Sequence, residues 1–348
     1  VAAGEKLAFG QSDVQLNGWS MECRINAEDP FRGFLPSTGR LVKFSPPQEV
    51  PGQVRVDTGV YDGGEISMFY DSMIAKLIVH AATREQAIER MRDALNSFVI
   101  RGISSNIPFQ SALMQHPRFQ AGNFTTAFIA EEYPKGFDAS DVPHDDPALL
   151  ISVAAFVHRT YIDRAARVTG QLPGHELKVG DEWVVLRDGE PHSVTVEAAE
   201  GGYDVTYSGE TFKLRSDWKL GEALFEGTVN GEPFTMQLER RKLAYRLFHW
   251  GTQVDLTVLR ARAAELLGLM PEKQAPDMSK FLLSPMPGLL REVAVTVGQE
   301  VKAGEKLAVI EAMKMENILK AEQDGKVKKI SAAAGESLSV DQIIIEFE

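Results

Sequence analysis

The pattern of apolar and polar positions divides the chain into three zones, and the first of them ends near residue 137. Strand-like runs occur over 21–26, 40–44, 52–57 and 74–80. Over 84–96 the apolar residues recur three or four positions apart, which predicts an amphipathic helix with Thr83 as its N-cap. The first zone, 1–137, is therefore expected to be a mixed α+β unit.

The second zone, 138–270, begins with a helix signal and continues with many strand signals. Asp146 and Pro147 form an N-cap and first-turn pair, so a helix should run to about residue 168, with Gly170 just past its end. Its first half is apolar nearly all round and requires burial on most sides. About eight strand-like runs follow, with turn signals at 188–189, 201–202, 208–209, 230–231 and 250–251. The pattern is typical of an antiparallel barrel or sandwich, and a barrel closed around the helix satisfies both signals.

The third zone, 281–348, contains an internal repeat. It follows a linker-like segment, 271–280, that has two prolines and few apolar groups. Five residues have counterparts 37 positions later: Gly288, Gly298, Val301, Gly304 and Leu307 correspond to Gly325, Gly335, Leu338, Asp341 and Ile344. Two copies of a short β unit are expected to pack as two similar sheets with pseudo-twofold symmetry. The segment 311–317 joins the copies and should form an exposed hairpin tip.

Composition is that of a globular protein and excludes several classes of function. Apolar residues make up 44% of the 348 residues and charged residues 25%, close to the globular average. The formal net charge of −12 argues against nucleic acid or an anionic membrane as the partner. The single cysteine, Cys23, excludes an internal disulfide and a cysteine-based zinc site. His144, His158 and His192 lack metal-like spacing, so no metal site is expected in this chain.

The ends and the apolar stretches of the chain predict neither a membrane span nor a signal peptide. The longest apolar stretch, 148–157, is far shorter than the roughly 20 residues that span a bilayer. The first residues lack a basic region followed by an apolar core. The beginning at Val1 is typical of the interior of a longer polypeptide.

The segment 311–317, Glu-Ala-Met-Lys-Met-Glu-Asn, carries the strongest chemical signal. Together with Ser-Pro-Met-Pro-Gly at 284–288, it resembles the biotinylation site of biotin carboxyl carrier domains. The resemblance implies biotin attached to Lys314, with Glu311, Ala312, Met313 and Met315 as flanking residues. A lysine at a hairpin tip is open to a biotin ligase, and the uncharged amide product turns it into a tether. Lipoyl carriers share the fold, but their lysine usually follows aspartate and lacks the methionine pair.

Four runs in the first zone resemble the C-terminal part of biotin carboxylases: 22–30, 34–37, 54–55 and 70–77. In that family the arginine that matches Arg55 faces the biotin ring. The resemblance therefore implies that Arg55 stabilises the enolate-like anion of biotin and holds carboxyphosphate, because a guanidinium stays charged and its fork matches planar oxyanions. Tyr70, Asp71 and Lys76 are interpreted as structural, and Cys23 as a small core residue.

The ATP-grasp segment of that family has no counterpart in the sequence. We find no Gly-rich phosphate loop, no metal-binding glutamate pair and none of the catalytic run that normally precedes this region. The chain is therefore not expected to carboxylate biotin alone. The resemblance places the sites for ATP, Mg and bicarbonate elsewhere in a full subunit.

The middle zone resembles the domain that docks onto a carboxyltransferase subunit in acyl-CoA carboxylases. The runs 180–185, 216–218 and 269–273 are most similar to the bacterial propionyl-CoA carboxylase α subunits. The implied fold is multidomain: the C-terminal α+β part of a biotin carboxylase domain, a subunit-docking helix in an antiparallel β-barrel, a linker and a β-sandwich biotin carrier domain. The corresponding ranges are 1–137, 138–270, 271–280 and 281–348.

The implied function is that of the biotin-carrying α subunit, in part, of an acyl-CoA carboxylase, which is a biotin-dependent ligase. Biotin on Lys314 is carboxylated with ATP and bicarbonate. A carboxyltransferase β subunit then passes the carboxyl group to propionyl-CoA, giving methylmalonyl-CoA in propionate metabolism. The implied partners are that β subunit in a hetero-oligomer, a biotin ligase, and the acyl-CoA held by the β subunit. The loop ahead of the helix and the barrel surface should hold the β subunit.

Three alternatives stay open from the sequence. A 3-methylcrotonyl-CoA carboxylase α subunit shares the layout. A lipoyl-type carrier predicts lipoate on Lys314, and a non-enzymatic interaction module leaves Lys314 unmodified. A bacterial cytoplasm and a mitochondrial matrix both fit the sequence.

Overall fold

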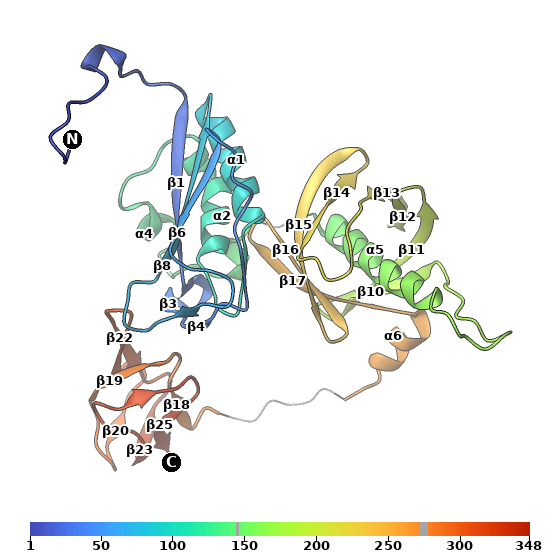
Figure 1. Cartoon of the computed structure of the whole chain (residues 1–348). Helices are drawn as coiled ribbons and strands as arrows, with labels where there is room; N and C mark the ends of the chain where they lie inside the picture. Colours follow the sequence, from blue (N-terminus) through green and yellow to red (C-terminus); the bar gives the residue numbers. More distant parts are fainter. Residues whose placement is uncertain (144–145, 272–277) are drawn as a thin grey trace.

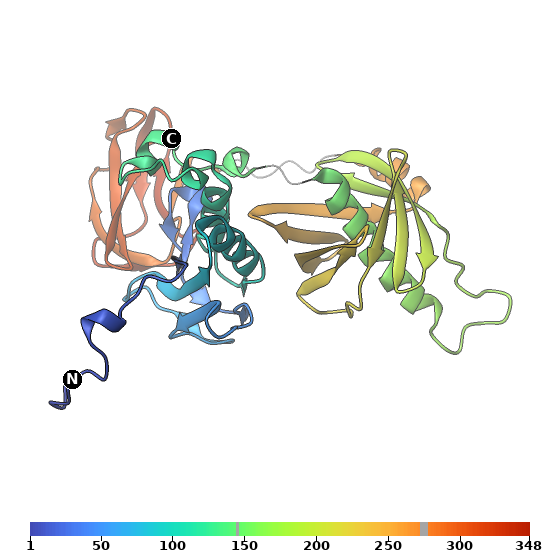
Figure 2. The same cartoon turned by 90° about the horizontal axis from the view of Figure 1, so that it is seen from above.

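The computed structural model describes residues 1–143, 146–271 and 278–348, which form three bodies with separate apolar cores. In Figure 1 the first body lies between the barrel on its right and the C-terminal body below it. Figure 2 again shows the C-terminal body beside the first body and the barrel on the opposite side. This architecture confirms the expected fold class, an α+β unit, a helix-containing barrel and a β sandwich.

The first body is built on a three-stranded antiparallel sheet with the order β1-β8-β6. Its strands are β1 (Trp19–Asn26), β6 (Val54–Thr58) and β8 (Met73–Ala81), and α1 (Arg84–Asn96) packs on one face. Thr83 caps α1 as predicted, because its hydroxyl accepts a hydrogen bond from the backbone N–H of Gln86 at 3.3 Å. Cys23 is buried in the core below α1, and burial raises the pKa of its thiol to about 12, as suits a core residue rather than a nucleophile.

Short elements complete the first body. They are β2 (Glu28–Asp29), β3 (Leu35–Pro36), β4 (Gly39–Arg40), β5 (Lys43–Ser45), β7 (Glu65–Ile66), β9 (Val99–Arg101), α2 (Ile107–Gln115), α3 (Pro117–Gln120), α4 (Phe128–Glu132) and the 3-10 turns η1 (Gln11–Asp13), η2 (Pro30–Arg32) and η3 (Ala139–Asp141). The single strand predicted at 40–44 is wrong, because this stretch divides into β4, which pairs with β7, and β5, which pairs with β9. The chain changes partner there: the backbone N–H of Leu41 donates to Gly64 and that of Val42 to Arg101.

Eight antiparallel strands close into a barrel around α5 (Pro147–Ala166), as the sequence predicted. In chain order they are β10 (Glu182–Arg187), β11 (Glu190–Ala199), β12 (Gly202–Tyr207), β13 (Glu210–Arg215), β14 (Leu224–Val229), β15 (Glu232–Arg241), β16 (Ala244–His249) and β17 (Thr252–Leu259). All side chains over 150–157 are buried, which explains the apolar pattern on every side of the helix. Asp146 caps α5 by accepting from the backbone N–H of Ala148 at 2.9 Å. The helix ends two residues before the predicted position.

Four of the predicted turns are two-residue hairpin loops in which both residues have positive φ. They are Asp188-Gly189, Ser208-Gly209, Asn230-Gly231 and Trp250-Gly251. This turn type follows the right-handed twist of the paired strands. In the fifth turn Gly201 also has positive φ, and its neighbour Gly202 is needed for space, because a Cβ atom there would lie 2.2 Å from the carbonyl oxygen of Leu214.

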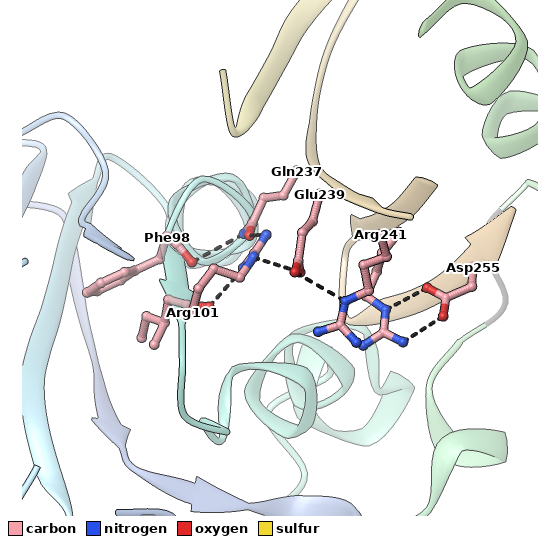
Figure 3. Close-up of polar contacts among 8 residues, drawn as sticks. Phe98, Arg101, Gln237, Glu239, Arg241 and Asp255 are labelled. Atoms are coloured by element: carbon pink, nitrogen blue, oxygen red, sulfur yellow. Dashed lines mark hydrogen bonds and ion pairs between the residues drawn. The ribbon is translucent and has the colours of Figure 1, made fainter. Parts of the chain in front are cut away.

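A buried polar network joins the barrel to the first body (Figure 3). The Nε2 of Gln237 on β15 donates to the carbonyls of Asn96 (2.7 Å) and Phe98 (3.2 Å), and its Oε1 accepts from Arg101 (2.9 Å). The Asn96 side chain donates to the carbonyl of Thr235 at 2.6 Å and accepts from the backbone N–H of Trp250 at 3.0 Å. Both buried amides are therefore satisfied across the interface, which favours one position of the barrel against the first body.

The C-terminal body consists of two four-stranded sheets, β18-β25-β23-β20 and β22-β21-β19-β24. The strands are β18 (Phe281–Leu283), β19 (Gly288–Val293), β20 (Glu300–Val301), β21 (Lys306–Ala312), β22 (Met315–Lys320), β23 (Gly325–Ile330), β24 (Ser337–Leu338) and β25 (Ile343–Phe347). The repeat is confirmed, because Val301 and Leu338 are buried alike and Gly304 and Asp341 both have positive φ. Each copy contributes strands to both sheets: β20 pairs with β23, for example, and β24 with β19.

One helix that was not predicted, α6 (Ala261–Leu267), lies between the barrel and the C-terminal body along the chain. Positions 272–277 of the expected linker 271–280 lie outside the described residues, as does His144. Within the described ranges, no helix is long and apolar enough to cross a membrane.

Candidate functional site

Lys314 lies at the tip of the hairpin formed by β21 and β22. Ala312 and Met315 are paired across the two strands, so Met313 and Lys314 form a two-residue loop between them. Both loop residues have positive φ, 49° and 60°, although neither is glycine. Such backbone conformations cost free energy for ordinary residues and are concentrated at functional positions. The Lys314 side chain is 63% exposed, so its amine is open to a modifying enzyme.

The residues that flank Lys314 have different surroundings. Ala312 is buried, while Met315 is 38% exposed. Glu311 forms an ion pair with Arg291 and not with the lysine. Met313 is only 2% exposed, and it is buried in the apolar cluster of the first body rather than in the core of its own sheets.

The hairpin tip therefore rests on the first body. The backbone N–H of Met313 donates to the carbonyl oxygen of Met68 at 2.6 Å. The Nζ of Lys314 lies 3.3 Å from Oδ1 of Asp71. A further contact joins the two bodies where Nη2 of Arg32 donates to the carbonyl of Pro285 at 3.1 Å. The segment that receives the tip lies between β7 and β8, and Figure 1 shows the β22 hairpin at this edge of the first body.

Arg55 lies on the solvent-facing side of the three-stranded sheet. Its guanidinium forms two hydrogen bonds with Asp57, at 2.8 and 2.9 Å, and these bonds raise its pKa. The strand register places Arg24 of β1 and Asp57 of β6 on either side of Lys76 of β8. Arg55 therefore belongs to an open sheet face on which charges of both signs alternate. Such a face presents fixed guanidinium donors that an oxyanion can bind.

The structure brings Lys314 together with Asp71 but not with Arg55. Among the described residues, Arg55 has no hydrogen bond or ion pair to the tip, and its register partner is Ile78, well along β8 from Asp71. The sequence reading treated Asp71 as structural and did not single out Met68. The exposed run at 69–71 offered the available signal, because both aromatic side chains beside Asp71 are more than 70% exposed.

The part of the chain that the structure describes contains no cluster of side chains that could bind a metal ion. Across 1–143, 146–271 and 278–348, no three His, Cys, Asp or Glu side chains are grouped so that they could hold an ion. His158, one of the histidines considered above, is held between Tyr245 and Trp183 inside the barrel, where burial lowers its pKa to about 4.

Comparison with protein families matches each body separately. Residues 22–131 match the family described as biotin carboxylase C-terminal domain. Residues 150–273 match the propionyl-coenzyme A carboxylase BT domain, and residues 275–347 match the family described as biotin-requiring enzyme.

Comparison with curated proteins covers the whole chain. The propionyl-CoA carboxylase alpha chain of Ruegeria pomeroyi is 49% identical over 367 residues, which cover 100% of this chain and 54% of that relative. The mitochondrial propionyl-CoA carboxylase alpha chain of Mus musculus is 36% identical, covering 100% of this chain and 49% of the relative. The mitochondrial methylcrotonoyl-CoA carboxylase subunit alpha of the same species is 28% identical at the same coverage. The chain thus spans about half the length of the curated relatives it matches. From the three matched domains and these identities, the chain is a homologue of the C-terminal part of propionyl-CoA carboxylase alpha chains.

Proposed function

We propose that this chain carries biotin on Lys314 and acts as the biotin-carrying part of an acyl-CoA carboxylase. The observation that supports this most strongly is the tip itself. An exposed lysine occupies a two-residue loop in which both φ angles are positive. This loop joins the two repeated β units. That position presents the amine away from the body of the domain, as a ligase requires.

The residues at the tip fit an amide-linked biotin. A lysine amine is almost entirely protonated at neutral pH, so the ligase must take up a proton before the amide forms. When bound, biotin supplies the nitrogen that accepts and later releases a carboxyl group. Amide formation removes the charge that pairs with Asp71. The apolar contact of Met313 and its hydrogen bond to Met68 do not depend on that charge, so they can hold the modified tip as well.

Arg55 is proposed to act in the carboxylation of biotin. Its guanidinium is held by Asp57 on an open sheet face and keeps two N–H groups in a fixed plane. A fixed cation of this kind stabilises an oxyanion that develops next to it. In this arrangement Arg55 binds and orients the oxyanion, and Asp57 is its positioning residue. No step through ATP, Mg or bicarbonate is assigned to the described residues, because they offer neither a metal cluster nor a phosphate loop.

The acyl substrate is proposed to be propionyl-CoA, bound by a carboxyltransferase β subunit and converted to methylmalonyl-CoA. The barrel matches a family named for propionyl-coenzyme A carboxylase, and the identity to such alpha chains exceeds the 28% identity to the methylcrotonoyl-CoA relative. The β subunit is proposed to bind the barrel surface and the loop ahead of α5. The loop after α5 adds exposed apolar side chains at Val168, Leu172 and Leu177. Named relatives are bacterial and mitochondrial, and both compartments fit this proposal.

The modification is tested by peptide mass spectrometry of Lys314 after expression with an active biotin ligase. We expect a biotin adduct on Lys314 and none in Lys314→Arg. A bare or lipoylated lysine, with a control carrier domain biotinylated in the same cells, contradicts the proposal. The substrate is tested by assembling the full enzyme with its β subunit and comparing acyl-CoAs. A higher kcat/KM with 3-methylcrotonyl-CoA than with propionyl-CoA would contradict the proposed substrate but not the proposed role as biotin carrier.

A further inference from the structure

A cavity of about 490 Å³ lies where the barrel meets the first body. It is lined from one side by β9 and the start of α2, and from the other by β15, β16 and the start of β17. Figure 3 shows this region, with Glu239 of β15 lying between Arg101 of β9 and Arg241. The volume is within the range of small-molecule sites, and neither Lys314 nor Arg55 lines it. The proposed biotin chemistry therefore leaves the cavity unused.

Three guanidinium groups line this cavity, and the carboxylates that pair with them are fewer. Arg101 and Arg241 share one partner, Glu239, whose carboxylate oxygens lie 3.5 and 3.1 Å from their Nε atoms. Arg246 is held by Asp255 with both hydrogen bonds at 2.6 Å. Among the described residues, three guanidinium groups are thus directly paired with two carboxylates.

Another carboxylate in the cavity wall, Asp29, is hydrogen-bonded to groups other than the arginines. Asp29 accepts hydrogen bonds from the backbone N–H of Phe31 at 3.1 Å and from the Ser104 hydroxyl at 3.3 Å. Among the described residues, Oε2 of Glu239 accepts no hydrogen bond. Among the described residues Asp29 forms no ion pair with these arginines, and Glu239 contacts Arg101 only at a long 3.5 Å.

Two of the three guanidinium groups are shielded from water, whereas Arg241 is half exposed. The side chains of Arg101 and Arg246 are 17% and 19% exposed. Desolvation, with smaller contributions from Arg241 and Arg246, lowers the pKa of Arg101 to about 10 against the attraction of Glu239. A shielded cation beside two others is costly unless an anion joins them.

The rest of the lining is suited to an apolar body. Phe98, Ile103 and Phe248 line the cavity, and the guanidinium of Arg101 lies 4.0 Å from the centre of the Phe248 ring. Ser105 and Ser111 add hydroxyl groups near the start of α2. The wall therefore combines a cationic rim with aromatic and aliphatic surface, the usual composition of a site for an organic ligand.

We propose that this cavity is a binding site for a small organic anion, with a phosphate or carboxylate head held by Arg101 and Arg241 and a flat apolar body against Phe248. Because its walls come from both bodies, a bound anion contacts the barrel and the first body at once. Occupancy then stabilises the barrel in the position that the Gln237 network defines. This inference does not depend on modification of Lys314.

The test uses the full chain and two defined probes, phenyl phosphate and benzoate, in titration calorimetry at constant ionic strength. Benzyl alcohol is the uncharged control. We expect saturable binding of at least one anion at one site per chain and none of the alcohol. The stronger probe identifies the head group as phosphate or carboxylate.

Two variants with opposite expected effects locate the site. Arg241→Gln removes a half-exposed cation whose one hydrogen-bond partner among the described residues is Glu239, and should weaken binding about tenfold. Glu239→Gln removes the competing carboxylate and should tighten binding several-fold. Arg187→Gln is the matched control, because this barrel arginine pairs with Asp188 and does not line the cavity.

Three results would contradict an anion site in this cavity. The proposal is overturned if no anion binds saturably, if Arg241→Gln binds as tightly as the unaltered chain, or if Arg187→Gln weakens binding as much. Circular dichroism checks that each variant is folded. If Glu239→Gln does not fold, the binding affinities of Arg241→Gln and Arg187→Gln, compared with each other, are sufficient to test the proposed site.

Discussion

Replacing Met313 by alanine should release the hairpin tip from the first body. The Met313 side chain is 2% exposed because it enters the apolar cluster of the first body, while its neighbour across the lysine, Met315, is 38% exposed. Alanine keeps the backbone N–H that donates to Met68, and it leaves the Lys314–Asp71 pair intact. The substitution therefore removes the apolar contact and little else.

The size of the effect follows from the contacts that hold the tip. Full burial of a methionine side chain contributes about 1.5–3 kcal/mol. The Lys314–Asp71 pair is 63% and 75% exposed, and a pair so open to solvent contributes at most about 1 kcal/mol. Loss of about 2 kcal/mol from docking corresponds to a shift of roughly 30-fold from docked to undocked molecules. Met315→Ala should shift the same equilibrium by less than about threefold, because that side chain is partly in water already.

The docking equilibrium can be followed by energy transfer between two fluorophores. Cysteines at exposed Glu89 on α1 and Glu322 in the C-terminal body take the labels, and Cys23 is buried with its pKa raised to about 12, so it stays unlabelled. We expect one narrow distance for the unaltered chain and for Met315→Ala, and a broad distribution for Met313→Ala. Equal distributions for the two methionine variants would refute the reasoning, because burial of Met313 would then not hold the tip.

Three further predictions concern the barrel. Gln237→Leu removes the hydrogen-bond partner of the Asn96 and Phe98 carbonyls and of the Arg101 side chain. The free energy of unfolding, measured by urea titration, should therefore fall by about 2–4 kcal/mol. The control Gln253→Leu, at an exposed position, should change it by less than about 0.5 kcal/mol. Arg159→Met removes the cation that pairs with Asp163 and Asp181 and donates to Val196, so it should cost about 3–5 kcal/mol; a loss below 1 kcal/mol would show that the pair is not needed. Burial lowers the pKa of His158 to about 4 in the folded state, below its usual value near 6.5, so between these pH values only the unfolded chain binds the proton. The free energy of unfolding should therefore fall by up to about 3 kcal/mol as the pH is lowered from 6.5 to 4. His158→Gln should flatten this part of the plot of stability against pH.

Local pattern predicted the elements that depend on near neighbours in the chain. The helical spacing over 84–96, the cap at Thr83 and the turn pairs each act within a few residues, and the structure has all of them. The apolar circumference of α5 required burial on every side, and the barrel supplies it. The 37-residue repeat alone places Lys314 at the joint between two β units, where the structure has the β21–β22 hairpin.

Only the tertiary structure decided which surfaces meet. The stretch 40–44 is one strand by pattern, yet it changes partner midway because β7 and β9 approach it from different parts of the chain. Met313 has the pattern of a core residue, but its core belongs to the first body, whose residues lie far earlier in the chain. The same holds for the arginines of the cavity, since Arg101 and Arg241 gain a common partner only when β9 and β15 come together. Periodicity encodes which side of an element is buried, whereas the partner of that side depends on the shape and charge of surfaces distant in the chain.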